Sequence, residues 1–121
     1  MRSVHTVMVG MALGLVALST LSCGDSAPAA PRTAAKLWSD EGCALCHGKQ
    51  AEGTKLAPTL QGKAAHWSRE SLLQYLRDPV GYAAQDPRLK EQMKSYSQAM
   101  PTYKMLSATE LETLADYVLG L

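Results

Sequence analysis

Phenylalanine is absent from this sequence of 121 residues, and aromatic residues of any kind are few. No stretch of useful length alternates apolar and polar residues, which is the pattern of a half-buried β-strand. Several stretches instead repeat apolar residues at helical spacing, so we expect an all-α fold. The length allows one domain. A domain of fewer than 100 residues without phenylalanine has only a thin apolar core of its own.

The sequence also lacks a run of basic residues and an excess of one charge. Twelve lysines and arginines stand against eleven aspartates and glutamates, and loss of Arg2 with an N-terminal signal would make the two counts equal. Nucleic-acid-binding domains carry a basic patch or stripe that attracts phosphates. We therefore expect no nucleic-acid partner.

No apolar run is long enough for a convincing membrane-spanning helix, which needs about 20 residues. Residues 7–21 contain no Asp, Glu, Lys or Arg and follow the basic Arg2. A short apolar segment behind a weakly positive end is typical of a secretory signal. It ends in Ser22-Cys23, which resembles the lipobox of bacterial lipoproteins. We expect residues 1–22 to be a signal peptide cleaved before a lipidated Cys23, with ordinary cleavage nearby as the alternative.

Residues 23–33 are mostly small residues and proline, which cannot bury a core, so we expect a flexible tether there. The globular domain is then residues 34–121. A lipid on Cys23 would anchor an exported, periplasmic domain to a bacterial membrane. The tether would let the domain swing between partners at that membrane.

Cysteine is rare, and two of the three cysteines lie in one motif, Cys43-Ala44-Leu45-Cys46-His47. This spacing is the attachment signature of a c-type haem. Each sulfur adds to one vinyl group of the porphyrin, and the imidazole becomes the proximal iron ligand. A thioredoxin-type dithiol would lie in a βαβ setting, and a structural zinc site would need a second pair of Cys or His. Neither accompanies the motif, so we expect one covalent haem.

A buried porphyrin would supply the apolar surface that this short chain lacks. Its covalent bonds would also restrict the unfolded chain, as a cross-link does. We therefore expect the haem-free polypeptide to be poorly folded.

Local signals predict four helices. They are, in chain order, residues 34–41, a helix from 69 to about 77, a shorter helix from 87 and a last helix after 107. Ser68 is the expected N-cap of the second, and Pro79 forces its end. Pro87 opens the third. The last begins with a capping box formed by Ser107 and Glu110.

A second axial ligand decides between an electron carrier and a reactive haem. Met100 is the leading candidate, because Pro101 keeps it out of a helix and in a loop between two predicted helices. Its thioether would stabilise reduced iron relative to a second imidazole. Met93 and Met105 are interpreted as core packing residues. His66 is the imidazole rival, although a histidine at a helix entry is more often a surface residue.

Four segments, in this order, resemble monohaem class I cytochromes c: Cys43-x-x-Cys46-His47, Ala57-Pro58-Thr59-Leu60-x-Gly62, Met100-Pro101-x-Tyr103 and Leu114-Ala115-Asp116-Tyr117-Val118. The resemblance implies a small all-α fold of three to five helices around one haem, with the first and last helices crossing. It also implies that the carbonyl of Pro58 accepts a hydrogen bond from Nδ1 of His47. We place Pro58, Leu60, Trp67 and Tyr103 in the haem pocket.

The resemblance further implies a monomeric one-electron carrier rather than an enzyme, acting between membrane-associated redox proteins. One alternative is a haem subunit of an oxidase or reductase complex. Another is a ligand-binding sensor or peroxidase-like protein, if the sixth iron position is open. Four lysines flank the expected haem contacts and are either a docking rim or ordinary solvated side chains: Lys49, Lys55, Lys63 and Lys104.

Overall fold

The computed structural model describes residues 29–121. The predicted signal peptide (residues 1–22), the predicted lipidation site Cys23 and the first part of the predicted tether lie outside the described residues. Within the described range, no helix is both long enough and apolar enough to cross a membrane.

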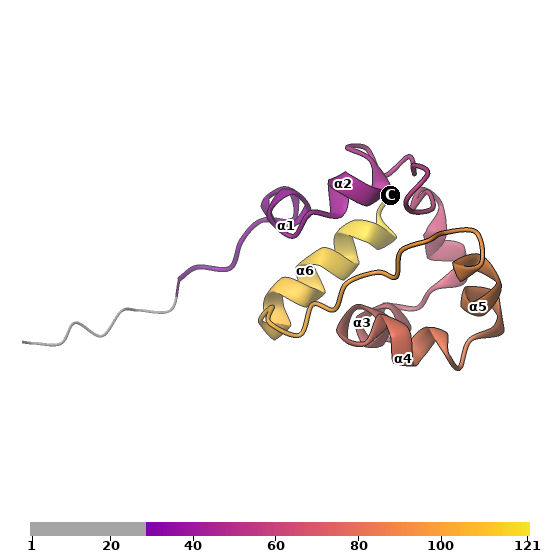
Figure 1. Cartoon of the computed structure of the whole chain (residues 1–121). Coiled ribbons are helices and arrows are strands. Elements are labelled where there is room, and N and C mark those ends of the chain that lie inside the picture. The colour runs from indigo at the N-terminus through magenta and orange to yellow at the C-terminus, as the bar shows by residue number, and fades with distance from the viewer. Residues whose placement is uncertain (1–28) are drawn as a thin grey trace, which may run out of the picture.

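Residues 29–121 form helices and loops and contain no strand, so the all-α prediction is confirmed. The elements are α1 (Ala34–Asp40), α2 (Cys43–His47), the 3-10 helix η1 (Lys63–His66), α3 (Arg69–Arg77), α4 (Pro79–Ala83), α5 (Pro87–Met93) and α6 (Ala108–Leu119) (Figure 1). The four helices expected from local signals correspond to α1, α3, α5 and α6.

The described chain has more helices than the three to five expected, because α2 and α4 are short. Each has five residues, which is little more than one turn and too short to show an apolar period. Gly42 and Gly48 bound α2 with φ angles of 73° and 86°, a region that suits glycine. Pro79, expected only to end α3, also opens α4, where the Asp78 side chain caps the new helix.

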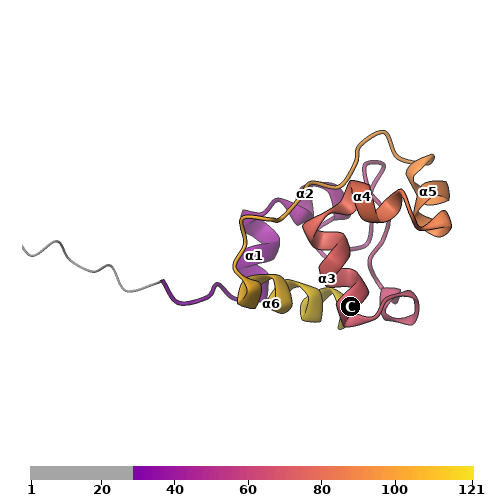
Figure 2. The same ribbon diagram turned by 90° about the horizontal axis from the view of Figure 1, so that it is seen from below.

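The core lies where α6 packs against α1 and α3, and the predicted crossing of the first and last helices is present (Figures 1 and 2). Leu37, Leu76 and Leu114, one from each of the three helices, have fully buried side chains. Trp38 of α1 meets Tyr117 of α6 edge to face, with ring centroids 5.5 Å apart. This contact between aromatic rings holds the two helices together where they cross.

Local capping agrees with the sequence, whereas the packing of two methionines does not. The Ser107 hydroxyl accepts the N–H of Glu110, and the Glu110 carboxylate accepts the N–H of Ser107, as the predicted capping box requires. Met105, expected to pack under α6, is 96% exposed. Met93, expected in the core, is 42% exposed, because the apolar face of α5 is buried only through Leu89. Both packing predictions are wrong.

Arg32, placed in the tether by its neighbours in the sequence, is bound to the folded chain. Its Nε donates to Glu110 Oε1 at 2.8 Å, and its Nη1 donates to Glu41 Oε1 at 2.8 Å. Asp40 Oδ2 lies 3.4 Å from the same Nη1. One guanidinium therefore joins the C-terminal end of α1 to the N-terminal end of α6.

Acid should weaken this junction. The hydrogen bond from Arg32, together with the backbone N–H of Ser107, lowers the pKa of Glu110 from 4.5 to about 2. The folded-state pKa lies below the unfolded one, so the resulting stability is present above pH 4.5 and is lost as the pH falls toward 2. The variant Glu110→Gln keeps a side chain that can cap the helix. We expect its melting temperature to fall less than that of the wild type when the pH is lowered from 4.5 to about 2. Parallel melting-temperature profiles would contradict this.

Truncation of the core leucine of α6 should be costly. Leu114 is 1% exposed, so Leu114→Ala leaves a cavity among α1, α3 and α6. We expect a loss of about 2–5 kcal/mol in the free energy of unfolding, measured by denaturant titration of the haem-loaded protein. Met105→Ala is the matched control, because an exposed side chain far from a special backbone site changes stability by no more than about 0.5 kcal/mol. Equal losses in the two variants would refute this account of the core.

Candidate haem site

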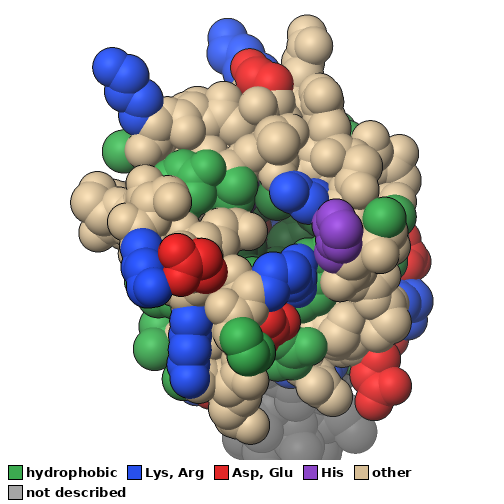
Figure 3. Space-filling model, turned by 90° about the vertical axis from the view of Figure 1, so that its right-hand side faces the viewer, with side chains coloured by type: hydrophobic (Ala, Val, Ile, Leu, Met, Phe, Trp, Pro, Cys, Tyr) green, Lys and Arg blue, Asp and Glu red, His purple; other side chains and the backbone are tan. Residues whose placement is uncertain are grey.

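A large cavity separates α2 and the loop after it from α3, α4 and α5. The space inside it, counted with the part that is open to solvent, is about 1270 Å³. On the face turned away from the N-terminal segment, the surface is hollowed over hydrophobic side chains (Figure 3). The cavity is lined by every predicted site residue in the described range: Cys43, Cys46, His47, Pro58, Leu60, Trp67, Met100 and Tyr103.

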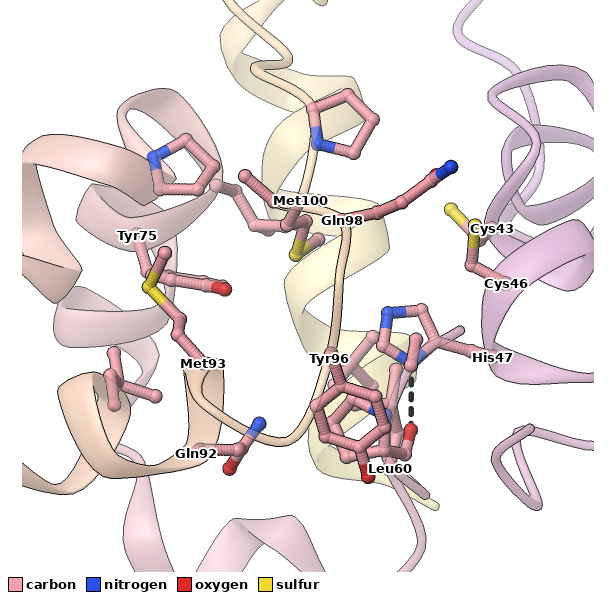
Figure 4. A pocket seen from close by; sticks show the side chains of 18 of the residues that line it. Cys43, Cys46, His47, Leu60, Tyr75, Gln92, Met93, Tyr96, Gln98 and Met100 are labelled. Carbon is pink, nitrogen blue, oxygen red and sulfur yellow. Dashed lines mark hydrogen bonds between the residues drawn. The ribbon is translucent and has the colours of Figure 1, made fainter. Parts of the chain in front are cut away.

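Helix α2 carries the two thiols and the imidazole on one side. Residues three and four apart share a face of a helix, so Cys43, Cys46 and His47 all project into the cavity (Figure 4). Cys43 and His47 are buried, and Cys46 is half-buried. The hydroxyl of Tyr103 lies 4.0 Å from the Cys43 sulfur. The tertiary structure thus gathers on one short helix the groups that covalent haem attachment requires.

The surroundings of the two thiols suit neither a thioredoxin-type dithiol nor a structural zinc site. Burial raises the pKa of Cys43, whereas a redox-active dithiol needs a cysteine with a lowered pKa. Residues 29–121 also contain no strand beside the motif. In the same residues, no group of three His, Cys, Asp or Glu side chains is close enough to hold a metal ion, so a zinc site gains no further ligands there.

The His47 ring is fixed in the tautomer that an iron ligand needs. Its Nδ1 lies 2.8 Å from the carbonyl oxygen of Pro58, which can only accept, so Nδ1 carries the proton and Nε2 keeps its lone pair. The hydrogen bond expected between these residues is confirmed. Burial lowers the pKa of His47 and thereby favours the neutral ring. The hydrogen bond to Pro58 has a smaller, opposing effect on this pKa. Such a bond also increases the basicity of the ligating nitrogen.

A tight loop holds Pro58 in place. The N–H of Gly53 donates to the His47 carbonyl at 2.7 Å, and the Thr54 hydroxyl donates to the Cys46 carbonyl at 2.5 Å. Gly53 has a φ of 85°, and a Cβ there would lie 2.5 Å from the backbone nitrogen of Thr59. Only glycine allows the two arms of the loop to approach so closely. The loop therefore closes back on α2 and aims the Pro58 carbonyl at the imidazole.

The loop before α6 brings Met100 into the same cavity. Its anchors to the end of α3 are the Tyr103 N–H, which donates to the Leu76 carbonyl at 3.1 Å, and the Thr102 hydroxyl, which donates to the Arg77 carbonyl at 2.8 Å. Figure 4 shows the Met100 thioether and the His47 imidazole pointing into the cavity from different segments. His66, the rival ligand, is exposed and does not line the cavity.

Sequence reasoning missed several lining residues. Tyr75 of α3 points its hydroxyl into the cavity (Figure 4), and burial raises its pKa, so it stays a neutral hydrogen-bond donor there. Its position three residues after Leu72, on the buried face of α3, was an available signal. Arg88 and Gln92 are four residues apart, a helical spacing that also marks one face of α5, and Tyr96 lines the cavity from the loop after that helix.

The cavity suits a porphyrin. Its lining is mainly apolar, with thiols and a neutral imidazole on α2. The charged residues that line it are Glu41, Lys63 and Arg88, so cations outnumber carboxylates there, which would suit a group that carries carboxylates of its own. Arg88 stacks 4.7 Å above the centre of the Trp67 ring, which holds its charge at the cavity edge. Polarity and donor groups therefore both fit a covalently attached haem.

The family model that matches this chain is described as "Cytochrome c" and covers residues 32–121. The chain belongs to the cytochrome c family. Membership implies a covalently bound haem c and electron transfer with redox protein partners. The matched region of this cytochrome c begins at Arg32, the residue whose ion pairs connect α1 to α6. Comparison with curated proteins and with solved structures gave no match.

Proposed function

We propose that this cytochrome c is a one-electron carrier with a single haem attached through Cys43 and Cys46, and with His47 and Met100 as axial ligands. One observation carries the proposal. His47 and Met100 face one cavity beside both thiols. The Nδ1–H of His47 donates to the carbonyl oxygen of Pro58, and Met100 lies on a loop that is hydrogen-bonded to α3. A haem with both axial positions filled by the protein exchanges electrons and has no open site for substrate.

The residues of the chain then have separate tasks. The hydrogen bond to Pro58 keeps the His47 imidazole oriented. The loop before α6, anchored to α3, keeps the Met100 thioether in the cavity, where it would bind the iron. The bound haem supplies reversible one-electron chemistry at its iron. A soft thioether and an apolar cavity both favour the reduced state, so this arrangement raises the reduction potential.

We also propose the cellular setting given by the N-terminal sequence: cleavage before Cys23, lipidation of its thiol, and a monomeric domain on the periplasmic side of a bacterial membrane. The support is the apolar segment, the third cysteine and the small residues after it. Redox proteins at that membrane would be the partners. Mass spectrometry of the mature N-terminus tests this part, and an unmodified or absent Cys23 would refute it.

A redox titration and a separate test of carbon monoxide binding examine the proposed function. The haem-loaded protein should titrate as a single one-electron couple, and its reduced spectrum should not change when carbon monoxide is added near neutral pH. Both results follow if Met100 occupies the sixth position. Rapid carbon monoxide binding would show an open iron and would favour the sensor or peroxidase-like alternative.

A further inference from the structure

The N-terminal segment and the cavity opening lie on opposite sides of the domain. In Figures 1 and 2, residues 29–33 leave the domain on one side, beyond α1, and α5 lies at the other end. The hollow in Figure 3 is seen from the side opposite that segment. Arg88, Gln92 and Met93 of α5 line the cavity there.

The exit point of the segment is fixed. Arg32 is only 30% exposed and contacts carboxylates of Asp40, Glu41 and Glu110. Thr33 follows at once as the N-cap of α1, and its side chain accepts the N–H of Lys36. Any chain that holds this domain from its N-terminus therefore pulls at Arg32, and not at a point nearer the opening.

The chain between Cys23 and Arg32 is too short to wrap around the domain. These nine peptide units span at most about 32 Å when fully extended. A domain of about 90 residues has a radius of gyration of about 12 Å, equivalent to a sphere whose half-circumference is roughly 50 Å. A surface that holds Cys23 can therefore touch the Arg32 side or the flanks of the domain, but it cannot reach the opposite pole.

We propose that, when the protein is held at a membrane through Cys23, the cavity opening faces away from that membrane. It then exchanges electrons with a redox protein that approaches from the aqueous side and not with a donor inside the bilayer. This inference rests on the proposed function, because it needs both a haem in the cavity and attachment at Cys23. Lys63 and Arg88 outnumber Glu41 among the charged residues that line the cavity, and this excess of positive charge suits an acidic partner surface.

Directed attachment to vesicles tests the orientation. The haem-loaded full chain is held on phosphatidylcholine vesicles through Cys23, by its own acyl chains or, if the thiol is free, through a maleimide headgroup. Reduction of the haem is followed by absorbance with ascorbate in the water or with a quinol in the bilayer. We expect the rate of haem reduction by ascorbate to stay within twofold of the rate for the free protein. The rate of reduction by quinol should be at least tenfold lower than for a control protein that is attached through α5.

The control is Cys23→Ser with Lys90→Cys, which attaches the protein through an exposed position on α5. It should show the reverse preference, with fast reduction by quinol. A third variant inserts twenty Gly and Ser residues after Ala29, which makes the tether long enough to pass the domain, and its quinol rate should rise toward that of the control. Equal quinol rates in the first two proteins would overturn the orientation. Failure of free haem-loaded protein to accept electrons would instead refute the proposed function.

Discussion

Replacing Met100 with alanine should abolish the methionine–iron charge-transfer band of the oxidised protein and lower its reduction potential. In the proposed function the thioether is the soft ligand that favours reduced iron, and its loss would leave water or no ligand in its place. Axial ligands set haem potentials over a range of about 0.8 V, and we expect a fall on the order of 0.1–0.2 V here. The measurements are the optical spectrum and a redox titration of protein matured in a host that attaches c-type haem.

Met93→Ala is the matched control for this variant. Met93 also lines the cavity, but it lies at the end of α5, is partly exposed, and is not followed by the hydrogen bonds that hold the Met100 loop against α3. We expect its charge-transfer band to persist. A band that survives Met100→Ala, or that is lost in Met93→Ala, would show that the ligand has been assigned to the wrong methionine.

Preventing haem attachment should unfold most of the domain. In the double variant Cys43→Ala and Cys46→Ala, the thioether bonds cannot form, and the apolar residues around a cavity of about 1270 Å³ lose their packing partner. A folded domain of this size has a total stability of only about 5–15 kcal/mol, so the remaining core cannot offset the loss. We expect weak helical circular dichroism and poorly dispersed nuclear magnetic resonance spectra.

Leu45→Ala tests whether the effect comes from the haem. Leu45 lies between the two cysteines but is exposed, so the variant keeps both thiols and His47 and should remain folded and loaded. If the double cysteine variant gave a well-dispersed spectrum like that of Leu45→Ala, the polypeptide would fold without the cofactor. The thin core argued from composition would then be sufficient by itself.

The starts and ends of the main helices could be predicted from the local sequence, because N-cap residues and prolines affect only the backbone within a few residues of them. Ser68 and Ser107 cap the helices they were expected to cap, and Pro87 opens α5. The short helices α2 and α4 were not predicted, because five residues are too few to show a helical period of apolar residues. Met105 was misplaced for a related reason. An apolar residue next to a helix is buried only if another element covers it, and that depends on distant parts of the chain.

The sequence by itself determined the groups that we propose for haem binding: the two thiols, the imidazole beside them and one methionine before a proline are identified by their order and spacing. It also determined where the main helices begin, through hydrogen bonds between near neighbours. Only the tertiary structure decided that Tyr75 and Arg88 share the cavity with those groups, and that Arg32 belongs to the fold. These contacts join segments tens of residues apart. They depend on how α1, α3, α5 and α6 are placed relative to one another, which the spacing of residues within one helix does not fix.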